Sequence, residues 1–138
     1  MGSRRHAREC ALQMLFERDL SGNLPVEIRA TFWQDRHEPD EVRSFADVLV
    51  SGTVQELEGI DRMIEEQAEH WRLERMPVVD RNIMRMAVYE LLHTDTPAAV
   101  VINEAIEIAR KFSTDESTQF VNGILDGIRR ELSHKADA

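Results

Sequence analysis

The 138-residue sequence is poor in cysteine, proline, glycine and aromatic residues, and each shortage excludes a class of protein. The single cysteine, Cys10, provides no disulfide framework, and its place in an apolar helical pattern argues against a thiolate metal site. Four prolines and six glycines are too few for the many turns of a β-sandwich. No apolar run reaches membrane-spanning length, and no uninterrupted apolar segment of a secretion signal follows the basic start. We therefore expect a cytoplasmic protein that does not enter a membrane.

The sequence does contain a helical spacing of apolar residues along almost its whole length. Prolines mark the starts of four expected helices, at positions 25, 39, 77 and 97. The stretch STDE at residues 113–116 has the pattern of a capping box and marks the start of the last helix. The sequence thus predicts an all-α fold of about seven helices, over residues 3–20, 25–36, 40–59, 60–71 and 77–92, and from 97 and 113 onward.

No arrangement of residues points to catalysis. The sequence has neither a glycine-rich phosphate loop after a strand nor a serine flanked by glycines, and its five histidines lack the spacing of metal ligands. The segment EEQAEH at residues 65–70 differs from the Glu-x-x-His pattern of di-iron bundles, because Gln67 stands three residues before His70. We expect this segment to be a solvated acidic helix face. The protein is accordingly expected to have no enzymatic activity, metal or cofactor.

The start of the first expected helix has an unusual charge. The formal net charge of the chain is −9, yet this helix begins with Arg4, Arg5 and Arg8. Cations are unfavourable there by about 0.3 kcal/mol or more each, because the amino end of a helix carries partial positive charge. Such an acidic protein does not bind nucleic acid through its overall charge, so we expect a local anionic partner. Guanidinium forks suit phosphates and guanine edges, and the alternative is a solvated basic tail.

The last expected helix has an aromatic residue beside its apolar stripe. The stripe consists of Val121, Ile124, Leu125, Ile128 and Leu132. Phe120 lies about 100° from the centre of this stripe, and Gly123 and Gly127 follow it at helical spacing. An aromatic ring beside two positions without side chains can form a shelf for an unstacked base. The alternative is close helix packing at the glycines, with Phe120 at the edge of the core.

Three long stretches resemble the NusB family of transcription antitermination factors. They are ARECALQMLF at residues 7–16, RMPVVDRNIMRMAVYELL at 75–92 and VVINEAIEIARKFSTDESTQFVNGILDGI at 100–128. The resemblance covers nearly the full chain. It implies one all-helical domain over residues 1–138, built from two small packed bundles at about 1–75 and 76–134.

The resemblance also implies a function. Proteins of this family bind the boxA element of nascent ribosomal RNA transcripts as a heterodimer with ribosomal protein S10 (NusE). They join RNA polymerase and other Nus factors in a complex that prevents termination and supports ribosomal RNA synthesis. Neither catalysis nor a cofactor is implied.

Several residues are expected to contact RNA. The resemblance implies contacts from the N-terminal arginines and Phe120, while Phe16 stands where the family often has a tyrosine and either stacks on a base or packs in the core. Arg81 and Arg85 either extend the basic track or pair with nearby glutamates. The expected RNA-contacting set is Arg4, Arg5, Arg8, Phe16, Arg85, Glu116, Gln119 and Phe120.

The resemblance places the surface for ribosomal protein S10 at the start of the fifth expected helix, around Glu74 and Asp80. The alternative for Asp80 is an ordinary helix-terminus charge. Asn103 and Asn122 are expected to be buried side chains that form hydrogen bonds between or within helices, since a buried amide must be satisfied.

Three other interpretations stay open. The first is a homodimer that covers the RNA surface. The second is a helical interaction domain without an RNA role, which the N-terminal arginines argue against. The third is an RNA-binding domain related to that of ribosomal RNA cytosine methyltransferases, although the sequence lacks a cofactor-binding βαβ pattern.

Overall fold

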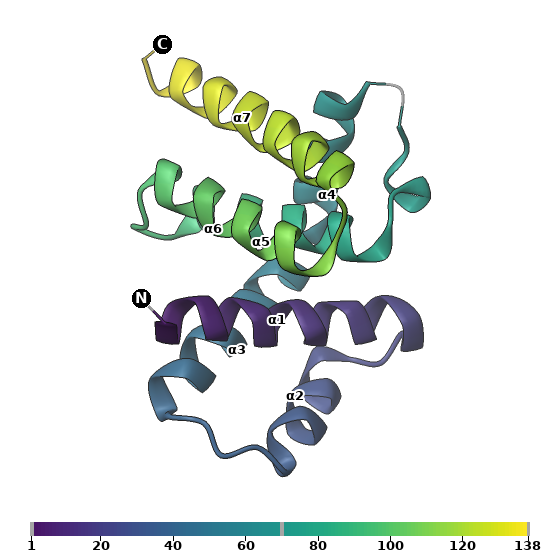
Figure 1. Ribbon diagram of the computed structural model, residues 1–138, viewed down its shortest axis with the longest axis vertical. Helices are drawn as coiled ribbons and strands as arrows, with labels where there is room; N and C mark the ends of the chain where they lie inside the picture. Colours follow the sequence, from purple (N-terminus) through teal and green to yellow (C-terminus); the bar gives the residue numbers. More distant parts are fainter. Residues whose placement is uncertain (1, 70, 138) are drawn as a thin grey trace. The chain divides into compact units, whose positions relative to one another are not determined.

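The computed structural model describes residues 2–69 and 71–137, and these residues are helical without a strand (Figure 1). The all-α prediction is therefore confirmed. The elements are α1 (Gly2–Ser21), α2 (Pro25–Gln34), α3 (Asp40–Gln55), α4 (Leu57–Ala68), the 3-10 turn η1 (Leu73–Arg75), α5 (Val78–His93), α6 (Ala98–Phe112) and α7 (Asp115–Asp137). None of the described helices has the length and apolarity needed to cross a membrane.

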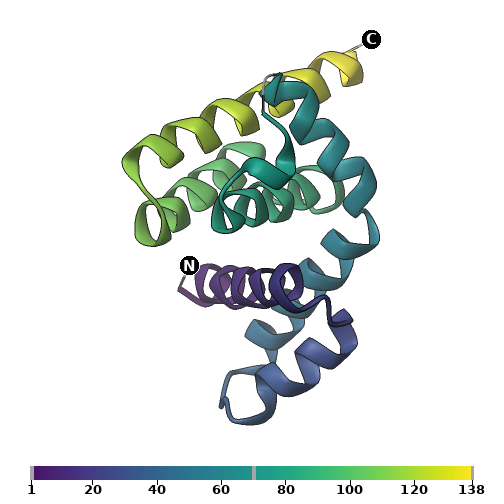
Figure 2. The same cartoon turned by 90° about the vertical axis from the view of Figure 1, so that its right-hand side faces the viewer.

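The chain divides into two compact units between Gln55 and Glu56. Helices α1, α2 and α3 form the first unit, and α4, η1, α5, α6 and α7 form the second (Figures 1 and 2). The resemblance had implied a division between the two bundles near residue 75. Helix α4 belongs to the second unit because it packs against α5 and α7.

The first unit is built on the contact of α1 with α3, and α2 packs against both. The buried side chains of α1 recur at helical spacing, and none of the following is branched at Cβ: Ala7, Cys10, Ala11, Met14 and Leu15. On α2, Trp33 is 7% exposed, and its indole nitrogen donates to Asp47 Oδ1 on α3 at 2.9 Å. This bond satisfies the buried indole and fixes α2 against α3.

Helix α5 is the centre of the second unit and packs against α4, α6 and α7. Its buried face includes Ile83, Met84, Ala87 and Val88, which explains why the sequence reads as almost continuously apolar there. Helices α4 and α7 also approach closely, since a Cβ atom on Gly127 would clash with the side chain of Gln67. Gly127 therefore allows close packing of two helices, which was one of the two roles that the sequence suggested for the glycines of α7.

The prolines mark helix starts as predicted, with small shifts in position. Pro25 is the first residue of α2, and the Glu27 carboxylate accepts a hydrogen bond from the backbone nitrogen of Leu24 at 3.0 Å. Pro77 and Pro97 instead stand one residue before α5 and α6, as N-caps. Their carbonyl oxygens accept the first hydrogen bonds of these helices, so the missing proline N–H has no cost at these positions.

The start of α7 differs from the predicted capping box. The cap is Thr114, whose hydroxyl accepts a hydrogen bond from the backbone nitrogen of Ser117 at 3.0 Å. Ser113 has another role, because its hydroxyl donates to Asp80 Oδ1 at 2.6 Å. The prediction that Ser113 and Glu116 form the box was wrong by one residue, and Glu116 is exposed in the first turn of α7.

Candidate nucleic-acid interface

Arg4 and Arg5 are exposed near the start of α1, whereas Arg8 is only 4% exposed. Two of these arginines lie over the ring of Phe45 on α3. The guanidinium carbon is 4.0 Å from the ring centroid for Arg4 and 5.3 Å for Arg8. Cation–π attraction at these distances orients the guanidinium groups without neutralising them. The expected basic cluster is therefore held in place by an aromatic residue of α3.

A shallow hollow of about 320 Å³ adjoins this cluster within the first unit. Its lining combines hydroxyl, charged and apolar side chains: Ser3, Arg4, Glu41, Ser44, Phe45 and Val48. Phe16 also lies on α1 and is half-buried, which fits both its packing and its stacking alternatives.

Arg85 lies inside the second unit and is 7% exposed. Its Nε and Nη2 atoms donate to the two carboxylate oxygens of Asp61 at 2.8 and 3.0 Å, and Nη1 donates to Asn82 Oδ1 at 3.1 Å. This paired fork is strong and directional. Arg85 is thus paired with an acidic side chain and does not extend a basic track, although the partner is an aspartate and not one of the expected glutamates. Arg81 donates to the backbone carbonyls of Leu73 and Glu74 and so holds the turn η1.

A second hollow, of about 310 Å³, surrounds Phe120 in the second unit. Phe120 is half-buried, Trp71 is 55% exposed, and the exposed Glu116 and Gln119 stand in the first turns of α7. The lining comes from the connection before α5 and from α7: Trp71, Arg75, Met76, Pro77, Asp80, Glu116, Ser117 and Phe120. Two aromatic side chains and one guanidinium therefore line a single open hollow.

The Phe120 hollow, as this second hollow is called below, has room beside it on α7. A Cβ atom on Gly123 would meet nothing within 4 Å, so this position is open space. Gly123 therefore fits the shelf interpretation, whereas Gly127 fits the packing interpretation.

The acidic residues expected at the partner surface have different environments. Asp80 is 1% exposed and accepts the hydrogen bond from Ser113, so it joins the start of α5 to the turn before α7. Its burial removes Asp80 from the surface that a partner protein can touch. The side chain of Glu74 is 71% exposed, and its Oε1 lies 3.7 Å from Arg72 Nη1.

An acidic surface lies close to Glu74 in the second unit. A hollow of about 240 Å³ is lined by Asp61, Glu65, Leu73, Glu74, Arg81 and Arg85. Glu65 and Glu66 on α4 and Glu69 directly after it are exposed, as the sequence predicted for this segment, while His70 lies outside the described residues. This exposed face is the charge complement of a basic protein.

Asn103 on α6 and Asn122 on α7 are both exposed, so the prediction that they are buried was wrong. Among the described residues, neither side chain has a hydrogen-bond partner. The helices α6 and α7 pack against each other through their apolar faces, and the two amides point outward from them. Both amides are consequently available to a ligand.

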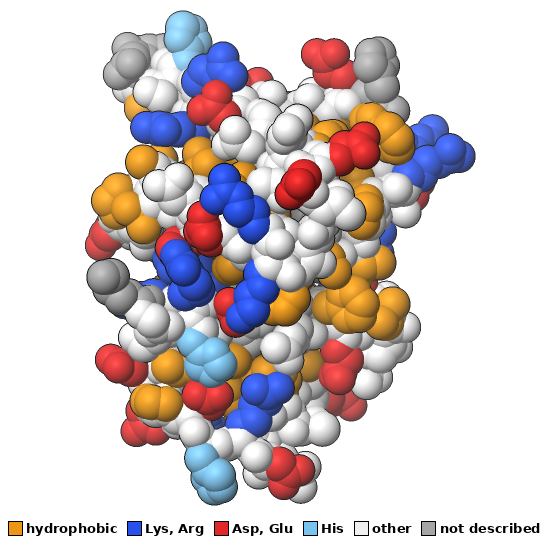
Figure 3. Space-filling model, viewed as in Figure 1, with side chains coloured by type: hydrophobic (Ala, Val, Ile, Leu, Met, Phe, Trp, Pro, Cys, Tyr) orange, Lys and Arg blue, Asp and Glu red, His pale blue; other side chains and the backbone are white. Residues whose placement is uncertain are grey.

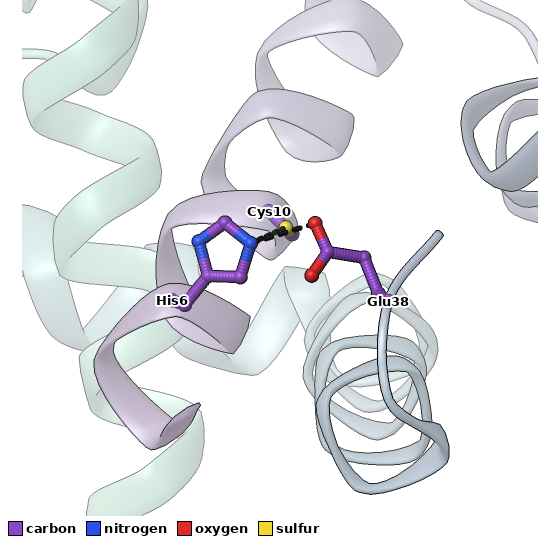
Figure 4. A group of neighbouring side chains, drawn as sticks. All are labelled: His6, Cys10 and Glu38. Atoms are coloured by element: carbon purple, nitrogen blue, oxygen red, sulfur yellow. Dashed lines mark hydrogen bonds and ion pairs between the residues drawn. The ribbon is translucent and has the colours of Figure 1, made fainter. Parts of the chain in front are cut away.

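The sequence argued against a metal site, but the structure brings together three potential ligands from two separate segments of the chain (Figure 4). His6 and Cys10 are one turn apart on α1, and Glu38 comes from the connection between α2 and α3. His6 Nε2 lies 2.7 Å from Glu38 Oε2 and 3.9 Å from Cys10 Sγ. Burial, aided by the charge of Glu38, raises the pKa of the Cys10 thiol to about 11. The free thiol therefore keeps its proton at neutral pH.

Charges are mixed over the face shown in Figure 3. On the face shown in Figure 3, Lys and Arg side chains lie among Asp and Glu side chains without forming one continuous basic area.

Comparison with known proteins identifies the family. A model of the NusB family matches residues 5–130. The chain belongs to the NusB family. The transcription antitermination protein NusB of Koribacter versatilis is 51% identical, and the match covers 95% of this chain and 91% of the relative. The same protein of Solibacter usitatus is 53% identical over 96% of this chain and 92% of the relative.

Solved structures of NusB proteins have the same fold. NusB from T. maritima superposes with a TM-score of 0.84 at 36% identity, covering 93% of this chain and 91% of that chain. A crystal structure of the antitermination factors NusB and NusE in complex with double-stranded RNA superposes with a TM-score of 0.85 at 29% identity. The match covers 95% of this chain and 98% of that chain. These relatives are transcription antitermination factors, which agrees with the expectation of a protein that is not an enzyme.

Within this NusB-family chain, sequence reasoning missed Trp71, Arg75 and Phe45. Trp71 stands at the end of the helix expected over residues 60–71, Arg75 stands before the helix expected from Pro77, and Phe45 stands within the helix expected over residues 40–59. The available signal was a tryptophan and an arginine in a short polar stretch before Pro77, where no core helix would bury them.

Proposed function

We propose that this NusB-family chain is a transcription antitermination factor that binds the boxA RNA of nascent ribosomal RNA transcripts together with ribosomal protein S10 (NusE). The observation that carries the proposal is the Phe120 hollow, in which Trp71, Phe120 and Arg75 are grouped. The solved NusB and NusE complex with RNA supports the same combination of partners. In this proposal the complex supports ribosomal RNA synthesis by joining RNA polymerase and other Nus factors.

The Phe120 hollow fits an unpaired base. Stacking on an aromatic side chain contributes about 1–3 kcal/mol per base, and it does not require a particular base. The exposed ring of Trp71 and the half-buried ring of Phe120 offer two such faces, while Arg75 supplies positive charge for the adjoining phosphate. Gln119 and Asn122, both exposed on α7, offer amides that can donate to and accept from base edges.

The start of α1 fits the phosphate backbone. Arg4 and Arg5 are exposed, and the contact of Arg4 with Phe45 limits the rotamers that its guanidinium must give up on binding. Phosphates near these side chains also offset the unfavourable interaction between the arginines and the helix dipole. Arg8 is buried beside Phe45 and Arg85 is paired with Asp61, so we assign the direct contacts to Arg4 and Arg5.

Ribosomal protein S10 is proposed to bind the acidic surface beside Glu74. Glu74 and Glu65 line one hollow, and both side chains are exposed. Glu74→Lys is therefore expected to weaken the association with S10 about tenfold, a size typical of charge reversal against a complementary surface. Glu58→Lys on α4, where the side chain is 92% exposed, is the control with the same charge change. Equal weakening by both variants would indicate a general charge effect and reject this surface.

The function is tested by titrating labelled boxA RNA with the protein, with and without S10, and repeating the titration with a scrambled RNA of the same length. We expect boxA RNA to bind more tightly than the scrambled RNA, and S10 to strengthen the binding further. Equal affinity for both RNAs in the presence of S10 would refute the boxA assignment. Sedimentation of the protein alone gives the oligomeric state, so that a homodimer which releases its subunits on binding RNA is recognised.

A further inference from the structure

We propose that His6, Cys10 and Glu38 form a binding site for a divalent transition-metal ion, with Zn²⁺ as the best match. The three ligand atoms all lie within 4.8 Å of one another in the first unit (Figure 4). They belong to segments that are 32 residues apart, so the fold brings them together.

The distances fit a tetrahedral ion after small movements. Zn²⁺ bonds of about 2.0 Å to nitrogen and oxygen and 2.3 Å to sulfur place neighbouring ligand atoms about 3.3–3.7 Å apart. The His6–Glu38 separation of 2.7 Å would have to widen slightly, and the His6–Cys10 separation of 3.9 Å would have to shorten slightly. Side-chain rotation is sufficient for both changes, because two of the three residues are only half-buried.

The ligand types select the metal. One imidazole, one thiolate and one carboxylate form a mixed set that suits Zn²⁺ and Co²⁺, whereas Mg²⁺ and Ca²⁺ prefer oxygen ligands alone. The side chain of His6 is 44% exposed and that of Glu38 is 18% exposed, so the ion has access from solvent and water can complete a fourth position. Cys10 is fully buried beneath them and closes the site from the core side.

Binding changes the charge of the first unit in a defined way. The Cys10 thiol gives up its proton when the Zn–S bond forms, and the His6–Glu38 contact is replaced by two bonds to the ion. One Zn²⁺ enters and one proton leaves, so the site gains one positive charge on the helix that carries Arg4 and Arg5. Arg36 and Glu9 are two further charges that act on Cys10, and they have opposite signs. Coordinate bonds from the ion to Glu38 and to the two α1 ligands also link the α2–α3 connection to α1.

The test uses the full-length protein and Co²⁺, which gives a near-ultraviolet charge-transfer band only when a thiolate is bound. We expect one equivalent of Co²⁺ to produce this band, one equivalent of Zn²⁺ to remove it, and the melting temperature to rise with added Zn²⁺. Absence of the band in the reduced wild-type protein would overturn the proposal.

Surface variants keep the test independent of folding. His6→Asn and Glu38→Gln change exposed or half-buried side chains and leave the buried Cys10 in place, and each is expected to lower the affinity for Co²⁺ roughly tenfold or more. His37→Asn, next to Glu38 but exposed and outside the cluster, is the matched control and is expected to bind like the wild type. If His6→Asn binds Co²⁺ as tightly as His37→Asn does, the site is not the one proposed.

Discussion

Helices α1 and α7, one in each unit, begin with opposite charges, although each is proposed to contact RNA. The first turn of α1 contains Arg4 and Arg5 and no acidic residue, whereas α7 begins with Asp115 and Glu116 after the Thr114 cap. The helix dipole favours the second arrangement and opposes the first. The start of α7 is therefore suited to helix stability, and the start of α1 is suited to binding an anion.

The difference also separates two modes of contact. Near α1 the exposed groups are the guanidinium forks of Arg5 and of Arg4, which lies over Phe45, and such forks suit phosphates of any sequence. Near α7 the available groups are aromatic faces and amides, with a carboxylate close by, which suit bases. We infer that α1 contributes mainly salt-dependent affinity, and that α7 contributes stacking and selectivity.

The largest expected effect is the loss of stacking at α7. Phe120→Ala and Trp71→Ala should each lower the affinity for boxA RNA by about 1–3 kcal/mol, since each removes one aromatic face of the hollow. Titration of labelled RNA measures the change. Phe112→Ala is the matched control, because Phe112 is 42% exposed at the end of α6 in the same unit and does not line the hollow. A loss of similar size in the control would contradict a specific stacking site.

The next effect concerns the charges of α1. The double variant Arg4→Ala, Arg5→Ala should bind RNA about tenfold more weakly at moderate salt and lower the slope of log K against log salt by about 1.4, because roughly 0.7 counterions are released per single-strand phosphate contacted. A salt series of RNA titrations measures both quantities. The double variant Arg62→Ala, Arg110→Ala removes the same charge from side chains that are 65% and 61% exposed elsewhere. An unchanged slope in the α1 variant would mean that these arginines form a solvated tail.

A smaller effect is expected from Glu116. Its charge lines the Phe120 hollow and repels a phosphate, and Thr114 rather than Glu116 caps α7. Glu116→Gln should therefore raise RNA affinity by up to about 1 kcal/mol, and the gain should shrink as salt is added. Asp115→Asn removes a charge from the same turn outside the hollow, so it should change RNA affinity less while having a similar effect on the helix. Tighter binding by Asp115→Asn than by Glu116→Gln would argue against this geometry.

The smallest effect comes from giving α1 an acidic start like that of α7. Gly2→Glu places a carboxylate in the first turn of α1, where a Cβ atom meets nothing within 4 Å. Relative to Gly2→Ala, which changes only helix propensity, it should stabilise the protein by about 0.3–1 kcal/mol through the dipole. The same carboxylate should weaken RNA binding. Thermal or urea unfolding measures the first change, and equal stability of the two variants would remove the dipole argument.

The helices were predictable because periodicity and prolines are local signals. The predicted starts at Pro25 and Pro77 match the observed helices within one residue. The start of α7 was misjudged because two hydroxyl residues are adjacent there, and a distant residue decides between them. Asp80 binds the hydroxyl of Ser113, which leaves Thr114 as the cap.

The candidate site was predictable only in part. Arg4, Arg5 and Phe120 stand out in the sequence, because their types conflict with a helix start or an apolar stripe. The burial of Asp80 and the pairing of Arg85 with Asp61 depend on contacts between separate helices, which spacing along one helix does not reveal. The His6–Cys10 pair had a local signal in its four-residue spacing, but its third member comes from another segment.

The two tryptophans described above give each unit its own optical reporter. Trp33 of the first unit is buried and bonded to Asp47, so its emission lies toward the blue and moves to the red when α2 separates from α3. Trp71 of the second unit is mostly in water, so its emission is already red and responds to whatever enters the Phe120 hollow. A single spectrum of the unlabelled protein therefore distinguishes the opening of the first unit from the occupation of the second, and Trp33→Phe and Trp71→Phe separate the two signals completely.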